Sequence, residues 1–215
     1  MGQYLLKKTI QKHYDSINAL AFSHDGSLFA SAADDGLIII FQANGSGREV
    51  RRFQVKAPVT TLLWRSRFGN TLVAGDTSGD VHTICLDGST SVSVTHNWTW
   101  STRTFHLQGN TYYHTINCVP GPIHCIVENG IWLAIGLGKV IQLVKQATIG
   151  AVSWLPGNYA NPKQFTATWE RTRLLPDPPK FPELEGELPE PIVHSLHFLG
   201  GGNVLLVTYM DHGVM

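Results

Sequence analysis

Hydrophobic and polar positions alternate in short blocks along most of the chain. Apolar and β-branched runs such as 17–23, 28–32 and 37–41 are separated by turns rich in Gly, Asp and Asn. Runs of this length bounded by turn residues are typical of β-strands. No segment of three turns shows the 3.6-residue period of an amphipathic helix. The pattern therefore predicts an all-β protein.

A strand-turn-strand unit recurs along the sequence. The turn at 34–36 joins two apolar runs, and the turn at 76–79 does the same. Asp35 and Ser78, each directly before a Gly, are 43 positions apart. A period of about 40–45 residues with several short strands per unit indicates a β-propeller blade. The predicted fold is a β-propeller of four-stranded antiparallel blades, with about three and a half blades present in an open or truncated ring.

The predicted units divide the whole chain as one partial propeller. Blade one is expected at about 13–55, blade two at about 58–118 with an aromatic insertion at 97–119, blade three at about 122–175, and an incomplete blade four at 192–215. The fourth strand of blade two is expected near 91–96. The segment 176–191 carries six prolines and several glutamates. Such a composition cannot pair within a sheet and predicts an exposed connector.

Composition and charge exclude several classes of function. The formal net charge is zero, from 16 basic and 16 acidic residues, so no basic patch indicates a nucleic acid or a membrane surface as a partner. The three cysteines are odd in number and form no C-x-x-C pair, which favours free thiols of a reducing compartment. The start of the chain lacks the apolar core of a signal peptide. The expected location is the cytoplasm or the nucleus.

Candidate catalytic and metal-binding groups do not converge. His194 and His197 are three positions apart on a predicted strand, where they face opposite sides, so joint metal ligation is not expected. His13, Ser31 and Asp35 are the three residue types of a hydrolase triad, but they span the loop, strand and turn of one blade and are expected to tie its backbone together. We therefore expect no catalytic residues, no metal and no cofactor.

In blade one these residues resemble the WD-repeat β-propeller family. The family places a His before the first strand of a blade, a Ser or Thr in the second, an Asp in the next turn and a Trp in the third strand, and these four form a hydrogen-bonded structural tetrad. His13, Ser31, Asp35 and Phe41 stand at the corresponding positions. Because Phe41 replaces the Trp, the implied network ends at Ser31.

Blade two departs from this pattern. It has Pro58 near the His position, Ser78 at the Asp position and Ile84 at the Trp position. The resemblance there depends on the spacing of the strands. Complete rings of the family usually hold about seven blades, which at about 40–45 residues each exceeds this chain.

The resemblance implies a protein–protein interaction scaffold without catalysis. The alternatives are a truncated gene product without independent function and, less favoured, a propeller hydrolase. The implied partners are other proteins of unknown identity, including a chain that completes the ring. The candidate partner-binding residues are Asp15, Asp34, Lys56 and Thr77 on the turns, and Trp98 and Trp100 in the insertion.

Overall fold

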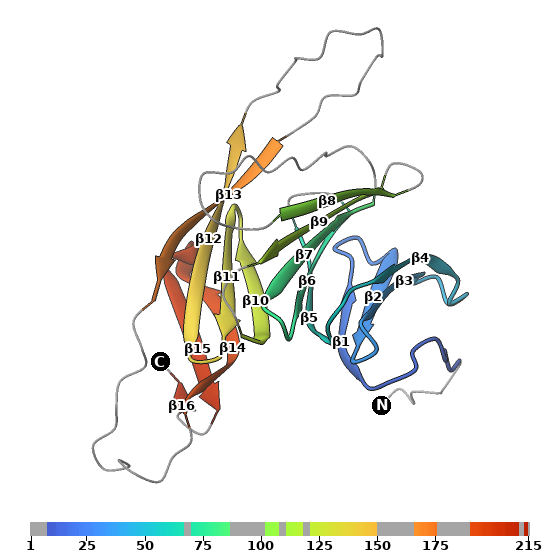
Figure 1. The fold of residues 1–215 in the computed structure, drawn as a ribbon, viewed down its shortest axis with the longest axis horizontal. Helices are drawn as coiled ribbons and strands as arrows, with labels where there is room; N and C mark the ends of the chain where they lie inside the picture. Colours follow the sequence, from blue (N-terminus) through green and yellow to red (C-terminus); the bar gives the residue numbers. More distant parts are fainter. Residues whose placement is uncertain are drawn as a thin grey trace, which may run out of the picture.

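The computed structural model describes residues 8–66, 70–86, 102–107, 111–117, 121–149, 166–175, 190–210 and 213–214. Its strands form four antiparallel sheets that follow one another in chain order from one end of the molecule to the other (Figure 1). We call these sheets blades one to four. The prediction of an all-β, propeller-type fold that forms an open, incomplete ring is confirmed.

Each blade is a meander of neighbouring strands. Blade one contains β1 (Ile17–Phe22), β2 (Leu28–Ala33), β3 (Leu37–Gln42) and β4 (Glu49–Gln54). Blade two contains β5 (Val59–Trp64), β6 (Thr71–Asp76), β7 (Asp80–Cys85), β9 (Thr111–Asn117) and β8 (Thr102–Leu107), in that spatial order. Blade three contains β10 (Ile123–Asn129), β11 (Trp132–Leu137), β12 (Val140–Ile149) and β13 (Thr166–Leu174). Blade four contains β14 (Ile192–Leu199), β15 (Val204–Met210) and β16 (Gly213–Val214), with a 3₁₀ turn at Gly200–Gly202.

Two blades differ from the four-stranded expectation. Blade two has five strands, because β8 and β9 form a hairpin and β9 takes the place next to β7. The segment 91–96, where the fourth strand was expected, lies outside the described residues. Blade four, which was expected to be incomplete, has three strands, and the third, β16, is short. Of the predicted connector 176–191, the structure describes residues 190 and 191 alone.

The cores lie between blades, since each sheet packs its apolar face on the next one. The first strands β1, β5, β10 and β14 are neighbours across these joints. Ile38 and Ile40 of blade one pack in one cluster with Leu72 and Ile84 of blade two. Equivalent clusters fill the joints between blades two and three and between blades three and four. The uninterrupted apolar run 37–41 is thereby explained, because β3 is buried on both faces.

The first strand of every blade begins with the same irregularity. The register with the second strand shifts just after one apolar residue, which we call the joint residue of its blade. The four joint residues are Ile17, Val59, Ile123 and Val193. A β-bulge repeated at one position indicates a structural device that sets how successive blades meet.

Glycines on the second strands receive two of the joint residues. A Cβ atom on Gly75 would lie 2.5 Å from Cγ2 of Ile123, and one on Gly136 would lie 2.7 Å from Cγ1 of Val193. Both distances are below any real contact, so each glycine is required for the next blade to approach this closely. The corresponding residue of blade one is Ala32.

Candidate functional site

Blade one holds a buried histidine that joins its turn to its second strand. His13 Nδ1 lies 3.1 Å from Asp35 Oδ2, and His13 Nε2 lies 2.6 Å from Ser31 Oγ. With Nδ1–H donating to the carboxylate, Nε2 accepts a hydrogen bond from the Ser31 hydroxyl. The structure therefore brings together three of the four residues of the implied tetrad.

The Asp35 carboxylate organises the segment before β1 and the start of β3. The backbone N–H of Tyr14 donates to Oδ2 at 2.8 Å, and that of Leu37 donates to Oδ1 at 2.9 Å. Burial alone would raise the pKa of Asp35, but the hydrogen bonds from Tyr14, Leu37 and His13 outweigh it and hold that pKa below its ordinary value. The carboxylate is therefore a fixed acceptor.

Phe41 replaces the missing indole with an aromatic contact. Its ring stacks on Phe29 with centroids 4.9 Å apart, and Phe29 contacts Phe22 at 5.8 Å. The three residues oppose one another across β1, β2 and β3. The ladder stabilises this face of blade one by stacking, without a hydrogen-bond donor at position 41.

The Ser31–His13–Asp35 connectivity is that of a hydrolase triad, but its setting is different. Ser31 is buried in the middle of the sheet, where it pairs with Leu20 on one side and Ile39 on the other. A nucleophile must expose its oxygen next to hydrogen-bond donors that stabilise the oxyanion. A hydroxyl enclosed by two strands has no such space, and the trio serves to fix the fold.

Blade two contains a second buried His–Asp pair that the sequence pattern did not indicate. His82 Nε2 lies 2.9 Å from Asp76 Oδ2, and both side chains are almost fully buried. Ser78 N and Asp80 N each donate to Asp76 Oδ1 at 2.9 Å, and the Ser78 hydroxyl donates to the same oxygen at 2.7 Å. The acceptor of this blade is therefore Asp76, and Ser78, which occupies the Asp position of the repeat, is a donor.

The electrostatics of Asp76 resemble those of Asp35. Burial would raise its pKa, but hydrogen bonds from His82, Ser78 and Asp80 lower it below the ordinary value. The available sequence signal was an Asp at the end of one strand with a His six positions later on the next. A turn of the observed length brings such residues together, as Ala74 and His82 are directly paired across β6 and β7.

A buried ion pair crosses the joint between blades two and three. Arg65 Nε donates to Glu128 Oε2 at 2.7 Å, and the Ser66 hydroxyl donates to Glu128 Oε1 at 2.7 Å. Burial lowers the pKa of Arg65, although Glu128 opposes this effect. Burying such a pair removes both charged groups from water, and this penalty offsets much of their attraction. The pair therefore acts mainly by specifying how blades two and three pack together.

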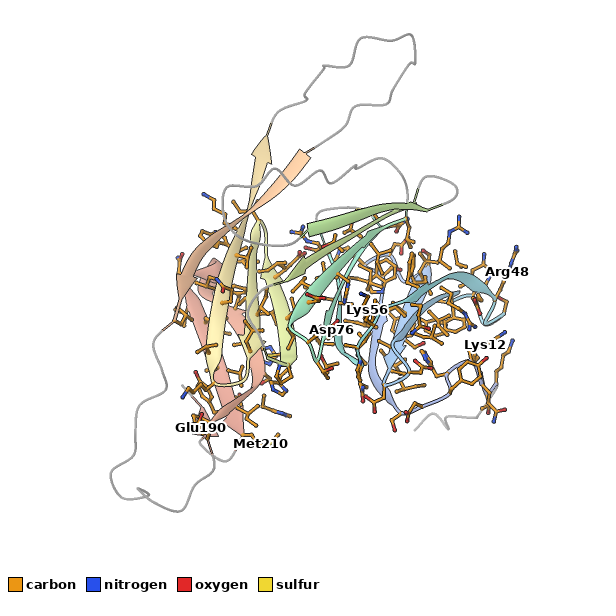
Figure 2. The ribbon with its side chains drawn as sticks, viewed as in Figure 1. Lys12, Arg48, Lys56, Asp76, Glu190 and Met210 are labelled. Carbon is orange, nitrogen blue, oxygen red and sulfur yellow. The ribbon has the colours of Figure 1, made fainter. Side chains whose placement is uncertain are left out.

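The candidate partner residues on the turns share one edge of the arc. Asp34 and Thr77 lie on the turns between second and third strands, and Asp15 and Lys56 lie just before first strands. All four are exposed. The Asp34 N–H donates to Ser16 O at 2.9 Å and the Thr77 N–H to Pro58 O at 3.0 Å, so each turn is held on the segment beside it. We call this the turn edge; Lys56 is labelled on it in Figure 2.

Two of these residues also have local partners. Asp34 Oδ1 accepts from Asn18 Nδ2 at 2.7 Å, and Asn18 donates in addition to Val59 O of blade two at 3.0 Å. Asp15 Oδ1 accepts from Ser16 N at 2.8 Å. In blade three the same edge carries Lys139, 3.2 Å from Glu190. Trp98 and Trp100 lie outside the described residues.

The described part of the chain offers neither a metal site nor a membrane-spanning helix. There, no three His, Cys, Asp or Glu side chains gather so that they could hold a metal ion. None of the helices described is long and apolar enough to cross a membrane. Burial raises the pKa of the Cys125 thiol to about 11, so that thiol is a weak nucleophile at neutral pH.

Comparison with known proteins agrees with the geometry. Residues 5–42 match the family described as "WD domain, G-beta repeat". The chain is also similar to the crystal structure of the computationally designed Ika4 protein, with a TM-score of 0.55 and 19% identity over 100% of this chain and 97% of that one. No curated protein sequence matches the chain. Residues 5–42 are therefore similar in sequence to a WD repeat, and the chain as a whole has a β-propeller fold.

Two longer structures resemble the chain over part of their length. The designed Ika8 protein aligns with a TM-score of 0.54 and 18% identity, covering 96% of this chain and 46% of that one. A chain in the crystal structure of the mitotic checkpoint complex aligns with a TM-score of 0.53 and 17% identity, covering 92% of this chain and 45% of that one. The chain thus spans less than half the length of these two structures.

Proposed function

We propose that this chain is a non-catalytic interaction scaffold that binds another protein through its turn edge and meets a further chain at its open ends. The main support is that four exposed residues lie at corresponding places of blades one and two, on turns whose backbone is held by hydrogen bonds: Asp15, Asp34, Lys56 and Thr77. Loop side chains on a rigid sheet scaffold are a common basis for recognition. WD-repeat propellers generally act as scaffolds.

The absence of catalysis is part of the proposal. The trio that resembles a hydrolase triad has its hydroxyl enclosed between β1 and β3. The second His–Asp pair is almost fully buried, and its aspartate already accepts hydrogen bonds from Ser78 and Asp80. Both arrangements favour a structural role. We also propose that the protein works in the cytoplasm or the nucleus.

Site-specific photo-crosslinking tests the turn edge. A benzophenone side chain placed at Thr77 or Lys56 is expected to capture a protein partner in cells, because both positions are exposed on the proposed surface. The matched control is Arg51, which is also exposed but lies on the outer strand β4, opposite Ile40. Capture that is equally strong from Arg51, or no capture from the turn edge, would overturn the proposal.

Purified components then quantify the interaction. The captured protein should bind the wild-type chain and lose at least tenfold in affinity to the variant with Asp15→Ala, Lys56→Ala and Thr77→Ala. Asp34→Asn is the preferred change at the fourth position, since its amide oxygen can still accept from Asn18 and preserve the joint. An unchanged affinity would contradict the proposed surface.

A further inference from the structure

The first strand of blade one leaves an apolar face uncovered. Ile17 is 51% exposed, and Leu20 and Phe22 are each 67% exposed. The other three joint residues are all 0% exposed: Val59, Ile123 and Val193. They are covered because each packs on the preceding blade, whereas no blade precedes blade one among the described residues. Blade one therefore presents half of a joint, which we call the open face.

A groove runs along the open face. It is lined mainly by apolar atoms, from Ile10, Leu20, Phe22, Phe29 and Gly47 among others. Single exposed apolar residues are ordinary on protein surfaces, but a contiguous hollow of aliphatic and aromatic groups indicates a contact surface. The shape and chemistry suit an apolar β-strand surface.

Blade four presents the opposite half of a joint. Leu199 and Val204 are paired across β14 and β15, and they are 47% and 54% exposed. The other side of these strands, with Leu196 and Tyr209, is buried against blade three. At every internal joint, an outward side of this kind receives the joint residue of the following blade. Figure 2 labels Met210 of blade four and Arg48 of blade one at opposite ends of the molecule, so one chain does not bring its two halves together.

Hydrogen bonds across two of the internal joints identify a donor for the missing one. The residue after the joint residue donates to the backbone of the next blade at the joint between blades one and two, Asn18 Nδ2 to Val59 O at 3.0 Å, and at the joint between blades two and three, Thr60 Oγ1 to Ile123 O. In blade four this position is His194, which is exposed. The ring N–H of His194 can donate to the backbone carbonyl of a joint residue placed beside it. The joint residue of the open face is Ile17.

We infer that the open face of blade one receives blade four of a second copy of this chain, so that two copies close head to tail. This inference rests on the proposed interaction function but uses a surface separate from the turn edge. The chain covers 46% and 45% of two longer structures that it resembles, so two copies together approach the length of one of them. Because the formal net charge is zero, two copies do not repel each other through their net charge.

One residue makes this joint weaker than the internal ones. Thr208 stands where blades two and three have Gly75 and Gly136. The Thr208 side chain holds Ile17 of the second copy away from β15. At the internal joints, Gly75 and Gly136 have no side chain and allow Ile123 and Val193 to come closer. Thr208→Gly is therefore expected to tighten the dimer about tenfold, and a loosened dimer would contradict the assigned pairing.

Cysteine pairing tests the orientation of the two copies. At the internal joints, the Cβ atom of the joint residue lies 2.9 Å or 3.1 Å from a Cβ built on the glycine, slightly closer than a disulfide requires. Ile17→Cys chains mixed with Thr208→Cys chains should form an oxidised dimer, while each variant alone and the wild type with its three cysteines should not. A double variant should stop at a covalent dimer.

Three other outcomes of the cysteine experiment would overturn the inference. A crosslinked dimer from Ile17→Cys alone would show that two open faces meet symmetrically and would overturn the inference. No crosslink on mixing would overturn it as well. A ladder of larger species from the double variant would show an open filament and overturn closure at two copies.

Sedimentation of single variants measures the contribution of the open face. Leu20→Glu should raise the dimer dissociation constant by roughly thirtyfold or more, since buried apolar anchors dominate interfaces. Because Leu20 is exposed in the single chain, this variant should keep the wild-type circular dichroism spectrum. Arg51→Glu is the control and should leave the dimer intact, because Arg51 is exposed on β4 opposite Ile40, on the side of blade one that faces blade two. A monomeric wild type would overturn the inference, while capture of a protein at Thr77 would still stand or fall by itself.

Discussion

Blade one and blade two bury the same two side-chain types, a histidine and an aspartate, but take them from different places in the repeat. In blade one the histidine comes from the segment before the first strand, and it reaches both the turn and the second strand. In blade two the histidine comes from the third strand and the aspartate from the end of the second. The strands follow one plan, whereas the polar network is specific to each blade.

The difference shows which part of a repeat is constrained. Strand spacing and the bulge at the joint residue must recur, because every blade packs on its neighbours. The buried acceptor at the turn must also be filled, since several backbone N–H groups converge there and need a partner. Asp35 supplies this acceptor in blade one and Asp76 supplies it in blade two. The position of the residue that supplies this acceptor can therefore differ between blades.

The largest expected effect comes from removing the two acceptors. Asp76→Ala should lower the free energy of unfolding by about 3 kcal/mol or more, because it removes the buried acceptor to which His82, Ser78 and the Asp80 N–H are hydrogen-bonded. Asp35→Ala should cost about 2 kcal/mol, since water can reach Tyr14 at the edge of that site. Urea unfolding of both variants measures the difference. A larger loss in blade one would reverse the proposed ranking.

The strands could be predicted from the sequence because their signals are local. The apolar runs and Gly-containing turns of blade one placed β1 to β3 within a residue or two of the observed bounds. The Asp76–His82 network was not predicted, because it depends on how the turn folds a carboxylate over the next strand. The Arg65–Glu128 pair joins residues far apart in sequence, and only the stacking of blades brings them together. The strand beside β7 was expected at 91–96, whereas the structure places β9 there, within the predicted insertion 97–119.

Acid titration sharpens the comparison between the two carboxylates. The pKa of Asp76 is lowered in the folded chain, so below its ordinary value of 3.8 the unfolded state binds more protons and stability falls. Asp76→Asn lacks this group, so its deficit relative to wild type should shrink as the pH falls from 5 through 3.8 and below. Asp35→Asn should behave in the same direction, as the Asp35 pKa is also lowered.

The measurement is the free energy of unfolding in urea at several pH values between 5.5 and 3. Glu49→Gln is a suitable control, because the pKa of Glu49 is lowered mainly by its hydrogen bond with Arg52 at the exposed outer strand. Salt should reduce the effect at Glu49 more than at Asp76, since exposed pairs are screened. A deficit of Asp76→Asn that stays constant across this range would show that the Asp76 carboxylate titrates normally in the folded protein.

The smallest expected effect comes from exchanging one residue between the blades. Ser31 of blade one and Ala74 of blade two occupy the same place, each opposite the fourth residue of its first strand. Ser31→Ala should cost about 1 kcal/mol, because His13 Nε2 loses its partner inside the sheet. Ala74→Ser should cost a similar amount for the opposite reason, as it places a hydroxyl at a position that is 0% exposed in an apolar cluster. Ser31→Thr keeps the hydroxyl and should stay close to wild type in urea unfolding. If Ser31→Ala were neutral, the histidine of blade one would depend on Asp35 alone, and the two networks would be more alike than their geometry indicates.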